Sequence, residues 1–231
     1  MTQEKLAVFD LDNTLLDGDS DDEWFNFLAA EGALDREAGA AAKADIVRRY
    51  REGSVGTLEF CEYFLQLYVP HEMPLLLAWR EKYMREWIVP RISAAARKLL
   101  DSHRDGLVAI ATATNRFITE PIAREFGVEH LIATEPEMRN GRFTGRVAGT
   151  PSFREGKAVR TEQWLAARGQ PLADFGESWF YSDSINDLPL LERVTHPVAV
   201  DPDERLRALA LERNWKIVSL RKTLPSRIAP C

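Results

Sequence analysis

Two aspartates separated by one residue follow the first apolar run of the chain. The run Leu6 to Phe9 leads directly into Asp10 and Asp12. Carboxylates at the end of a buried strand are costly unless a partner offsets their charge. Residues two apart in an extended chain share a face, so these carboxylates could converge on one metal-organised site. An ordinary acidic turn that caps the next segment explains the fragment equally well when it is taken alone.

A second apolar run, Leu107 to Ala111, ends in a cluster of hydroxyl and amide side chains. Thr112 and Asn115 stand here, just ahead of a predicted helix. Hydroxyls, an amide and free backbone N–H groups at such a junction suit a phosphate oxygen. Thr and Asn also serve as ordinary helix N-caps at this position, and this fragment does not separate the two roles.

A third apolar run, Trp179 to Tyr181, is followed by Asp183, Asn186 and Asp187. Two acidic strand ends in one sheet require a cation, and hard oxygen ligands without His or Cys favour Mg²⁺ over zinc. Lys157 opens the preceding helix and could offset the charge of the carboxylates and of a phosphate. By itself, this lysine is indistinguishable from a solvated surface residue.

The elements that must position these residues are short apolar runs alternating with helix-like stretches. This pattern is typical of buried parallel strands joined by helices in βαβ units, and it predicts an α/β fold with a doubly wound, Rossmann-like parallel sheet. Strands are expected at Leu6 to Phe9, Leu107 to Ala111, His130 to Ala133, Trp179 to Tyr181, Pro197 to Val200 and Lys216 to Val218. Helices are expected at Ser93 to Ser102, Ile118 to Phe126, Glu155 to Ala167, Asp187 to Glu192 and Asp203 to Arg213. Asn140-Gly141 predicts a small hairpin between the third and fourth strands.

The stretch from 17 to 90 contains no convincing strand and predicts several amphipathic helices. We therefore expect a helical cap at 17–90 inserted into a core formed by 1–16 and 91–231. The insertion leaves after the first strand and returns before the second, so it should stand over the carboxyl ends of the strands. Open α/β sheets bind their ligands there.

Composition restricts the partners of the chain. Its 231 residues, 45% hydrophobic and 29% charged, can build a sizeable core. The net charge of −6 with scattered Lys and Arg gives no footprint for nucleic acid or an anionic membrane, so a small molecule is expected. Two cysteines, Cys61 and Cys231, provide neither a disulfide framework nor a zinc site, which favours a reducing cytoplasm. We expect no signal peptide or membrane span, and either a monomer or a homodimer.

Taken together, the polar clusters resemble the four motifs of the haloacid dehalogenase superfamily, and the resemblance covers essentially the whole chain. The position of the helical insertion resembles the phosphoserine-phosphatase-like branch, and one bacterial subgroup of that branch contains histidinol-phosphate phosphatases. The residues that carry the resemblance are Asp10-Leu-Asp12-Asn-Thr14, Thr112, Lys157 and Asp183-Ser-Ile-Asn-Asp187.

The resemblance implies a phosphatase that hydrolyses a small phosphorylated metabolite with Mg²⁺. Asp10 would attack phosphorus, and Asp12 would protonate the leaving oxygen and later activate water. Asp10, the backbone carbonyl of Asp12 and Asp183 would hold Mg²⁺. Asp187 would orient Lys157 or a metal-bound water. Thr112, Lys157 and Asn186 would bind the other phosphate oxygens, and Asn115 is a further expected substrate-binding residue.

The substrate depends on residues outside the motifs. Asp19 falls where phosphoserine phosphatases carry an acidic residue for the substrate amino group, and with Ser20, Asp21, Asp22 and Trp24 it could form an acidic, aromatic-edged mouth. An amine- or imidazole-bearing ester would suit this mouth, with histidinol phosphate, phosphoserine and phosphoethanolamine-like esters as candidates. The same acids could simply start the first cap helix. No pair of arginines can be assigned to a substrate carboxylate, which counts against phosphoserine.

Two other functions fit part of the pattern. A phosphotransferase or phosphomutase would use the same phospho-Asp10 and differ only in the group that accepts the phosphoryl. A non-catalytic phospholigand-binding protein is the candidate from another class, although retention of every expected nucleophile and metal ligand argues against it.

Overall fold

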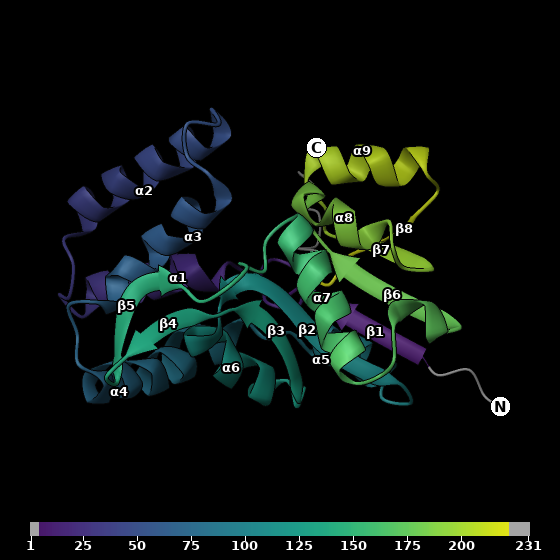
Figure 1. Ribbon diagram of the computed structural model, residues 1–231, viewed down its shortest axis with the longest axis horizontal. Coiled ribbons are helices and arrows are strands. Elements are labelled where there is room, and N and C mark those ends of the chain that lie inside the picture. Colours follow the sequence, from purple (N-terminus) through teal and green to yellow (C-terminus); the bar gives the residue numbers. More distant parts are fainter. Residues whose placement is uncertain (1–4, 222–231) are drawn as a thin grey trace, which may run out of the picture.

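A six-stranded parallel sheet forms the centre of the molecule, in the order β3-β2-β1-β6-β7-β8 (Figure 1). The computed structural model describes residues 5–221. The strands are β1 (Lys5–Phe9), β2 (Leu107–Asn115), β3 (His130–Thr134), β6 (Glu177–Ser182), β7 (His196–Val200) and β8 (Lys216–Val218). Each strand coincides with a predicted apolar run, and every neighbouring pair is parallel. The predicted doubly wound α/β fold is confirmed.

Helices cover both faces of this sheet. Alternate residues of β1 point to opposite faces, so Ala7 and Phe9 pack in one apolar cluster and Leu6 and Val8 in another. The first cluster includes α5 (Ala94–Asp101) and α6 (Arg116–Glu125), and the second includes α7 (Glu155–Ala167), α8 (Leu188–Leu191) and α9 (Glu204–Glu212). Burial on both faces explains why the core strands are apolar throughout and do not alternate with polar residues.

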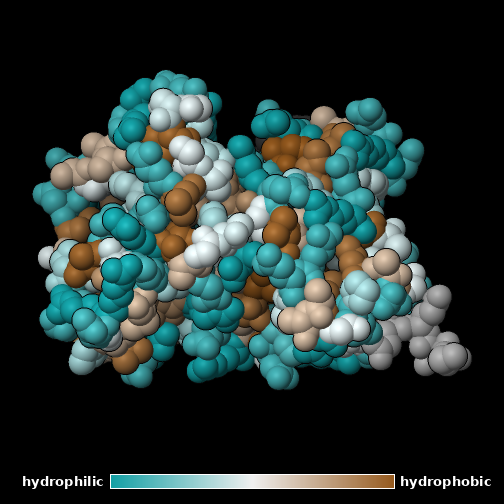
Figure 2. Space-filling model, viewed as in Figure 1, coloured by the Kyte–Doolittle hydropathy of each residue, from teal (hydrophilic) through white to brown (hydrophobic). Residues whose placement is uncertain are grey.

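Between β1 and β2 the chain forms a wholly helical insertion. Its elements are α1 (Ser20–Ala30), α2 (Arg36–Arg51), α3 (Thr57–Leu65), η1 (Gln66–Tyr68), α4 (Met73–Tyr83), η2 (Met84–Ile88) and η3 (Val89–Arg91). Leu16 and Ile92 form an isolated antiparallel bridge that ties together the two ends of the insertion. Figure 2 shows a notch between the lobe that carries α2 and α3 and the lobe that carries α8 and α9. The insertion agrees with the helices expected here, and the domain limits at 17 and 90 stay a prediction.

The predicted hairpin is present as β4 (Pro136–Arg139) and β5 (Arg142–Val147). Asn140 and Gly141 both have positive φ, 51° and 77°, as a tight hairpin turn requires. The hairpin packs on the helical insertion: the Gln66 side-chain amide donates to the Gly145 carbonyl at 2.9 Å, and the Val147 N–H donates to Glu62 at 3.2 Å. A segment from the second half of the sequence therefore supports the cap, an arrangement that the local sequence pattern did not predict.

No helix within the described range 5–221 is both long enough and apolar enough to cross a membrane. Cys61 is a free thiol, and Cys231 lies outside the described residues.

Candidate active site

The carboxyl ends of β1, β2 and β6 meet at the centre of the sheet. β1 pairs with β2 on one side and with β6 on the other, so the strand order reverses at β1. Ligands of open α/β sheets bind at such a reversal. Asp10 follows β1 and donates its N–H to the Tyr181 carbonyl at 2.9 Å, while Asp183 directly follows β6. The fold thus brings together side chains that lie more than 170 positions apart in the sequence.

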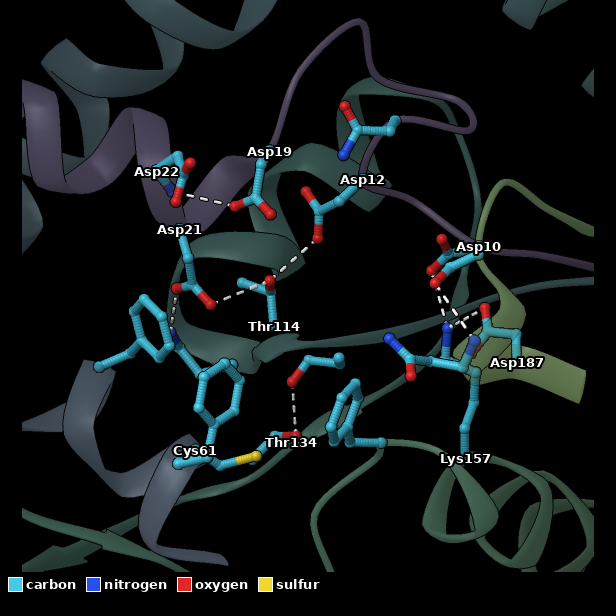
Figure 3. A pocket seen from close by; sticks show the side chains of 18 of the residues that line it. Asp10, Asp12, Asp19, Asp21, Asp22, Cys61, Thr114, Thr134, Lys157 and Asp187 are labelled. Atoms are coloured by element: carbon cyan, nitrogen blue, oxygen red, sulfur yellow. Dashed lines mark hydrogen bonds and ion pairs between the residues drawn. The ribbon is translucent and has the colours of Figure 1, made fainter. Parts of the chain in front are cut away.

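Asp10, Lys157 and Asp187 form a buried charged group at the base of this site (Figure 3). The Lys157 ammonium lies 2.9 Å from Asp10 Oδ1 and 2.7 Å from Asp187 Oδ2. Burial lowers the pKa of Lys157, but the charges of the two aspartates outweigh burial and hold it above the ordinary lysine value. Burial raises the pKa of Asp187 to about 6 although Lys157 opposes the shift. Lys157 is therefore a positively charged, fixed donor beside Asp10, and Asp187 occupies the position expected of a residue that orients it.

Thr14 links the two carboxylates expected to hold a metal. Its hydroxyl lies 3.4 Å from Asp10 Oδ2 and 3.3 Å from Asp183 Oδ1, and it accepts the Asp183 N–H at 3.0 Å. Burial, followed by the charges of Asp10 and Asp187, raises the pKa of Asp183 to about 9. Burial also raises the pKa of Asp10, against the opposing charge of Lys157. Asp10 and Asp183 therefore face one small volume in which their negative charges lack full compensation.

The residues at this place fit a magnesium ion. Over residues 5–221 no three side chains of His, Cys, Asp or Glu are grouped as a metal site. Mg²⁺ commonly uses only one or two protein carboxylates and takes its other ligands from water and phosphate. The buried carboxylate of Asp10 and the half-buried carboxylate of Asp183 converge on the Thr14 hydroxyl and provide that set, and a divalent cation between them would relieve their repulsion.

Asp12 points toward the helical insertion. Its Oδ1 accepts the N–H of Ser20, the first residue of α1, at 2.7 Å, and its Oδ2 accepts the Thr114 hydroxyl at 2.9 Å. The positive end of the α1 dipole thus lies beside this carboxylate. Figure 3 shows Asp12 between the group around Asp10 and the acidic residues of α1. Asp12 therefore lies between the buried charged group and the start of α1, and its role in proton transfer stays a prediction.

The end of β2 differs from the sequence expectation. The strand continues four residues beyond Ala111, because Asn115 still pairs with β3. Thr112 is fully buried, and its hydroxyl donates to Asp12 Oδ2 at 3.2 Å, whereas Thr114 and Asn115 line the cavity. A direct contact between Thr112 and phosphate stays a prediction.

Asn186 also lines the cavity, as expected of a phosphate ligand. Its amide oxygen accepts a hydrogen bond from Arg154 Nε at 3.1 Å. Because the oxygen is occupied, the amide nitrogen is the group that would meet a phosphate oxygen.

The cavity above this group is strongly acidic. It has a volume of about 230 Å³, and its lining includes seven aspartates and one basic residue, Lys157. The aspartates are Asp10, Asp12, Asp19, Asp21, Asp22, Asp183 and Asp187. Asp19 caps α1 by accepting the Asp22 N–H at 2.9 Å, so it both starts the helix and lines the cavity. Such a surface favours a ligand that carries positive charge.

The prediction that Trp24 forms the aromatic edge of the substrate mouth is wrong. The side chain is 1% exposed and does not line the cavity. It packs against Phe27, Tyr68 and Tyr83, with ring centroids 5.0 to 5.8 Å apart. Contacts with these rings hold Trp24 in the apolar cluster, while Asp21, three residues earlier on α1, lines the cavity. The aromatic part of the wall comes instead from α3 and the loop before α7, through Phe60, Phe64 and Phe153.

Sequence reasoning did not single out Thr14, Thr114 or the phenylalanines of α3 as site residues. Thr14 stands within the first motif, and Thr114 lies two positions after Thr112 on the same face of a strand, so the period of the strand could have indicated it. No local signal distinguishes a phenylalanine of α3 that faces the cavity from one that packs in the core.

Comparison with known proteins agrees with this geometry. The family model for haloacid dehalogenase-like hydrolases matches residues 7–192. The chain belongs to this family. It is 39% identical over 219 residues to a histidinol-phosphatase of Neisseria meningitidis serogroup C (strain 8013), covering 94% of this chain and 99% of the relative. These matches confirm the predicted enzyme class, a phosphatase of the haloacid dehalogenase type.

Solved structures also resemble this chain, among them the following two. A protein of unknown function from Bordetella pertussis Tohama I superposes with a TM-score of 0.90 at 49% identity, over 95% of this chain and 100% of that one. A substrate-bound phosphoserine phosphatase has a TM-score of 0.66 at 19% identity, over 97% and 96% of the two chains, and shares the fold.

Proposed function

We propose that this phosphatase hydrolyses histidinol phosphate, or a closely similar phosphomonoester bearing an amine and an imidazole, through a phospho-Asp10 intermediate with Mg²⁺ as cofactor. One observation carries the proposal. Asp10 lies at the base of an acidic cavity, between the Lys157 ammonium and the Thr14 hydroxyl, which also contacts Asp183. The 39% identity to a histidinol-phosphatase over almost the full length of both chains supports this substrate.

In the first step, a carboxylate oxygen of Asp10 attacks phosphorus, and the ester P–O bond breaks. The carboxyl of Asp12 gives its proton to the leaving alkoxide oxygen. Lys157 neutralises negative charge on the phosphate and is held for this by Asp187. Burial of Asp10, Lys157 and Asp187 keeps water from competing with these contacts.

In the second step, the Asp12 carboxylate accepts a proton from a water molecule, whose oxygen attacks the phosphorus of phospho-Asp10. The acyl-phosphate P–O bond breaks, which restores Asp10 and releases inorganic phosphate. Hydrogen bonds from Ser20 and Thr114 fix Asp12 in one position for both proton transfers. When bound by Asp10, Asp183 and the Asp12 carbonyl, Mg²⁺ would supply positive charge that orients and neutralises the phosphate.

The leaving group would occupy the acidic end of the cavity. Asp19, the N-cap of α1, and Asp21 in its first turn line this end together with side chains of α3. An ammonium or imidazolium group would offset the carboxylate charge there. The structure provides no comparable cluster of basic lining residues for a substrate carboxylate, since Lys157 is the one basic residue of the described lining.

The test is a phosphate-release assay on histidinol phosphate, phosphoethanolamine and phosphoserine, each with Mg²⁺ and with EDTA. We expect histidinol phosphate to be the preferred substrate and EDTA to abolish turnover. The Asp10→Asn variant should lose more than about 10³-fold in kcat, because it lacks the nucleophile. Asp45→Asn, at an exposed position of α2, is the matched control and should retain activity.

Full turnover by Asp10→Asn would refute the nucleophile. Addition of an alcohol such as glycerol to the same assay distinguishes transfer to an acceptor from hydrolysis, because transfer would yield a new phosphate ester in place of inorganic phosphate. Tight binding of the esters without turnover would instead indicate a phospholigand-binding protein.

A further inference from the structure

The side-chain oxygen of Asn115 is a buried acceptor without a partner. The residue is 3% exposed and lines the cavity, and its Oδ1 forms no hydrogen bond within residues 5–221. Its amide nitrogen donates to the Tyr68 hydroxyl at 3.0 Å and to Asp21 Oδ1 at 3.4 Å. A buried acceptor left unsatisfied costs about 1–3 kcal/mol, so this oxygen indicates a missing donor.

The contacts of Asn115 determine which end of the amide is free. A carboxylate accepts hydrogen bonds, so the end of the amide directed at Asp21 must be the nitrogen. The oxygen is then left for a ligand, and only an N–H or O–H group can satisfy it. This acceptor lies at the end of β2, next to α1 and η1.

Asp21 lies beside this acceptor without an ion-pair partner in the described chain. Its Oδ2 lies 3.1 Å from the Thr114 hydroxyl, which also contacts Asp12, and no Lys, Arg or His nitrogen lies within 4 Å among residues 5–221. Its neighbour Asp22 differs, because it forms an ion pair with Lys43. Burial, and next the charge of Asp12, raises the pKa of Asp21 to about 7, as expected for a carboxylate that lacks a cation.

An apolar aromatic surface completes the same end of the cavity. Phe60, Phe64 and Cys61 from α3 line it, and Phe153 joins them with its ring 6.0 Å from that of Phe60 at 26°. Figure 3 shows Asp21 and Cys61 at one end of the cavity and Asp10 with Lys157 at the other. The surface provides flat faces for stacking but no polar group for a hydrated ammonium.

We propose that Asp21 and Asn115 form a specificity subsite for an N–H-bearing heteroaromatic ring in the leaving group, an imidazole or imidazolium. The inference rests on the proposed function and assigns the ring of that substrate to named residues. A ring N–H donates to Asn115 Oδ1 or to Asp21, and the ring faces pack on Phe60 and Phe64. A flat ring satisfies both requirements at once, since its donors lie in the plane and its faces are apolar.

The test compares kcat/KM for histidinol phosphate with kcat/KM for phosphoethanolamine, which has an amine but no ring. In Asp21→Asn we expect the ratio of these two values to fall by about 10- to 100-fold, because a charge-assisted hydrogen bond to the ring is lost. Asp45→Asn is the matched control, and its ratio should equal that of the unsubstituted enzyme. A ratio unchanged in Asp21→Asn overturns the subsite, while hydrolysis of the esters themselves would still support the proposed function.

A binding measurement decides the question without turnover. Histidinol, the ring-bearing alcohol, is titrated calorimetrically into the unsubstituted protein, Asp21→Asn and Asn115→Leu, with circular dichroism as the check on folding. Weaker binding to each folded variant, by about tenfold or more, supports the subsite. Equal affinity for the unsubstituted protein and a folded Asp21→Asn overturns it, even if neither ester is hydrolysed.

Discussion

Replacing Lys157 by Met should destabilise the protein in a way that depends on pH. Lys157 is 2% exposed and contacts Asp10 at 2.9 Å and Asp187 at 2.7 Å. Methionine keeps most of the apolar stem but removes the charge. The variant would leave two buried carboxylates that face each other without a cation.

The magnitude follows from the burial of these groups. Removing one partner of a buried ion pair costs about 3–5 kcal/mol, because the remaining charge is uncompensated. Burial already raises the pKa values of Asp10 and Asp187, the latter to about 6, and loss of Lys157 would raise them further. At pH 8 folding of the variant must either bury the charged carboxylates of Asp10 and Asp187 or protonate them at a pH well above the pKa of an exposed aspartate. At pH 5.5 protonation of these carboxylates costs less free energy. We therefore expect a loss of about 3–5 kcal/mol at pH 8 and a clearly smaller loss at pH 5.5.

The assay is urea unfolding in EDTA at both pH values, followed by circular dichroism and analysed by linear extrapolation. Lys82→Met is the matched control: this lysine is 40% exposed and pairs with Glu31 at 2.6 Å, so its loss should cost no more than about 1 kcal/mol at either pH. A loss at Lys157 that is below 1 kcal/mol, or equal at pH 8 and pH 5.5, would show that the buried pairs are not the source of stability described here.

Three further outcomes follow from the same structure. Trp24→Ala should lower the free energy of unfolding in urea by about 3–5 kcal/mol, because it removes a buried ring from the aromatic cluster. The control Met138→Ala, at a residue 48% exposed, should lower it by less than about 1 kcal/mol. Similar losses for both variants would place Trp24 at the surface. Without divalent cations the free energy of unfolding should fall as pH rises from about 4 to 9, because Asp183, with a pKa of about 9, keeps its proton in the folded state longer than in the unfolded state. The proposed Mg²⁺ site requires the deprotonated folded form, so calorimetry should record a larger Mg²⁺-induced rise in Tm at pH 8.5 than at pH 6. Equal rises would argue against a site at Asp183.

The sheet was predictable from the sequence because its signal is local. Strands buried on both faces must be apolar throughout, and each such run coincides with a strand of the structure. Helix α7 has the predicted limits, Glu155–Ala167. The errors were small and lay at ends, as with β2, which continues to Asn115 because it pairs with β3 beyond the apolar run.

The arrangement of the insertion was predictable only in outline. The sequence indicated helices between β1 and β2. However, α1 carries acidic and aromatic side chains together, and which of them point to the cavity depends on the segments that pack against the helix. Tyr68, Tyr83 and Phe117 bury Trp24, while Thr114 and Asn115 draw Asp21 to the cavity. These partners are distant in the sequence, so no local pattern reports them.

The sequence by itself determined the enzyme class and indicated which residue types gather at the site. Parallel strands place their carboxyl ends at one edge, so Asp10 and Asp183, which follow apolar runs, were expected at the same edge of the sheet. The pairing of β1 with β6 then made them neighbours. Only the tertiary structure decided what surrounds them: the Thr14 hydroxyl between the carboxylates, and the Asn115 oxygen left open beside Asp21. Such contacts depend on distances of a few ångströms between segments up to 169 residues apart, which packing sets and local sequence does not.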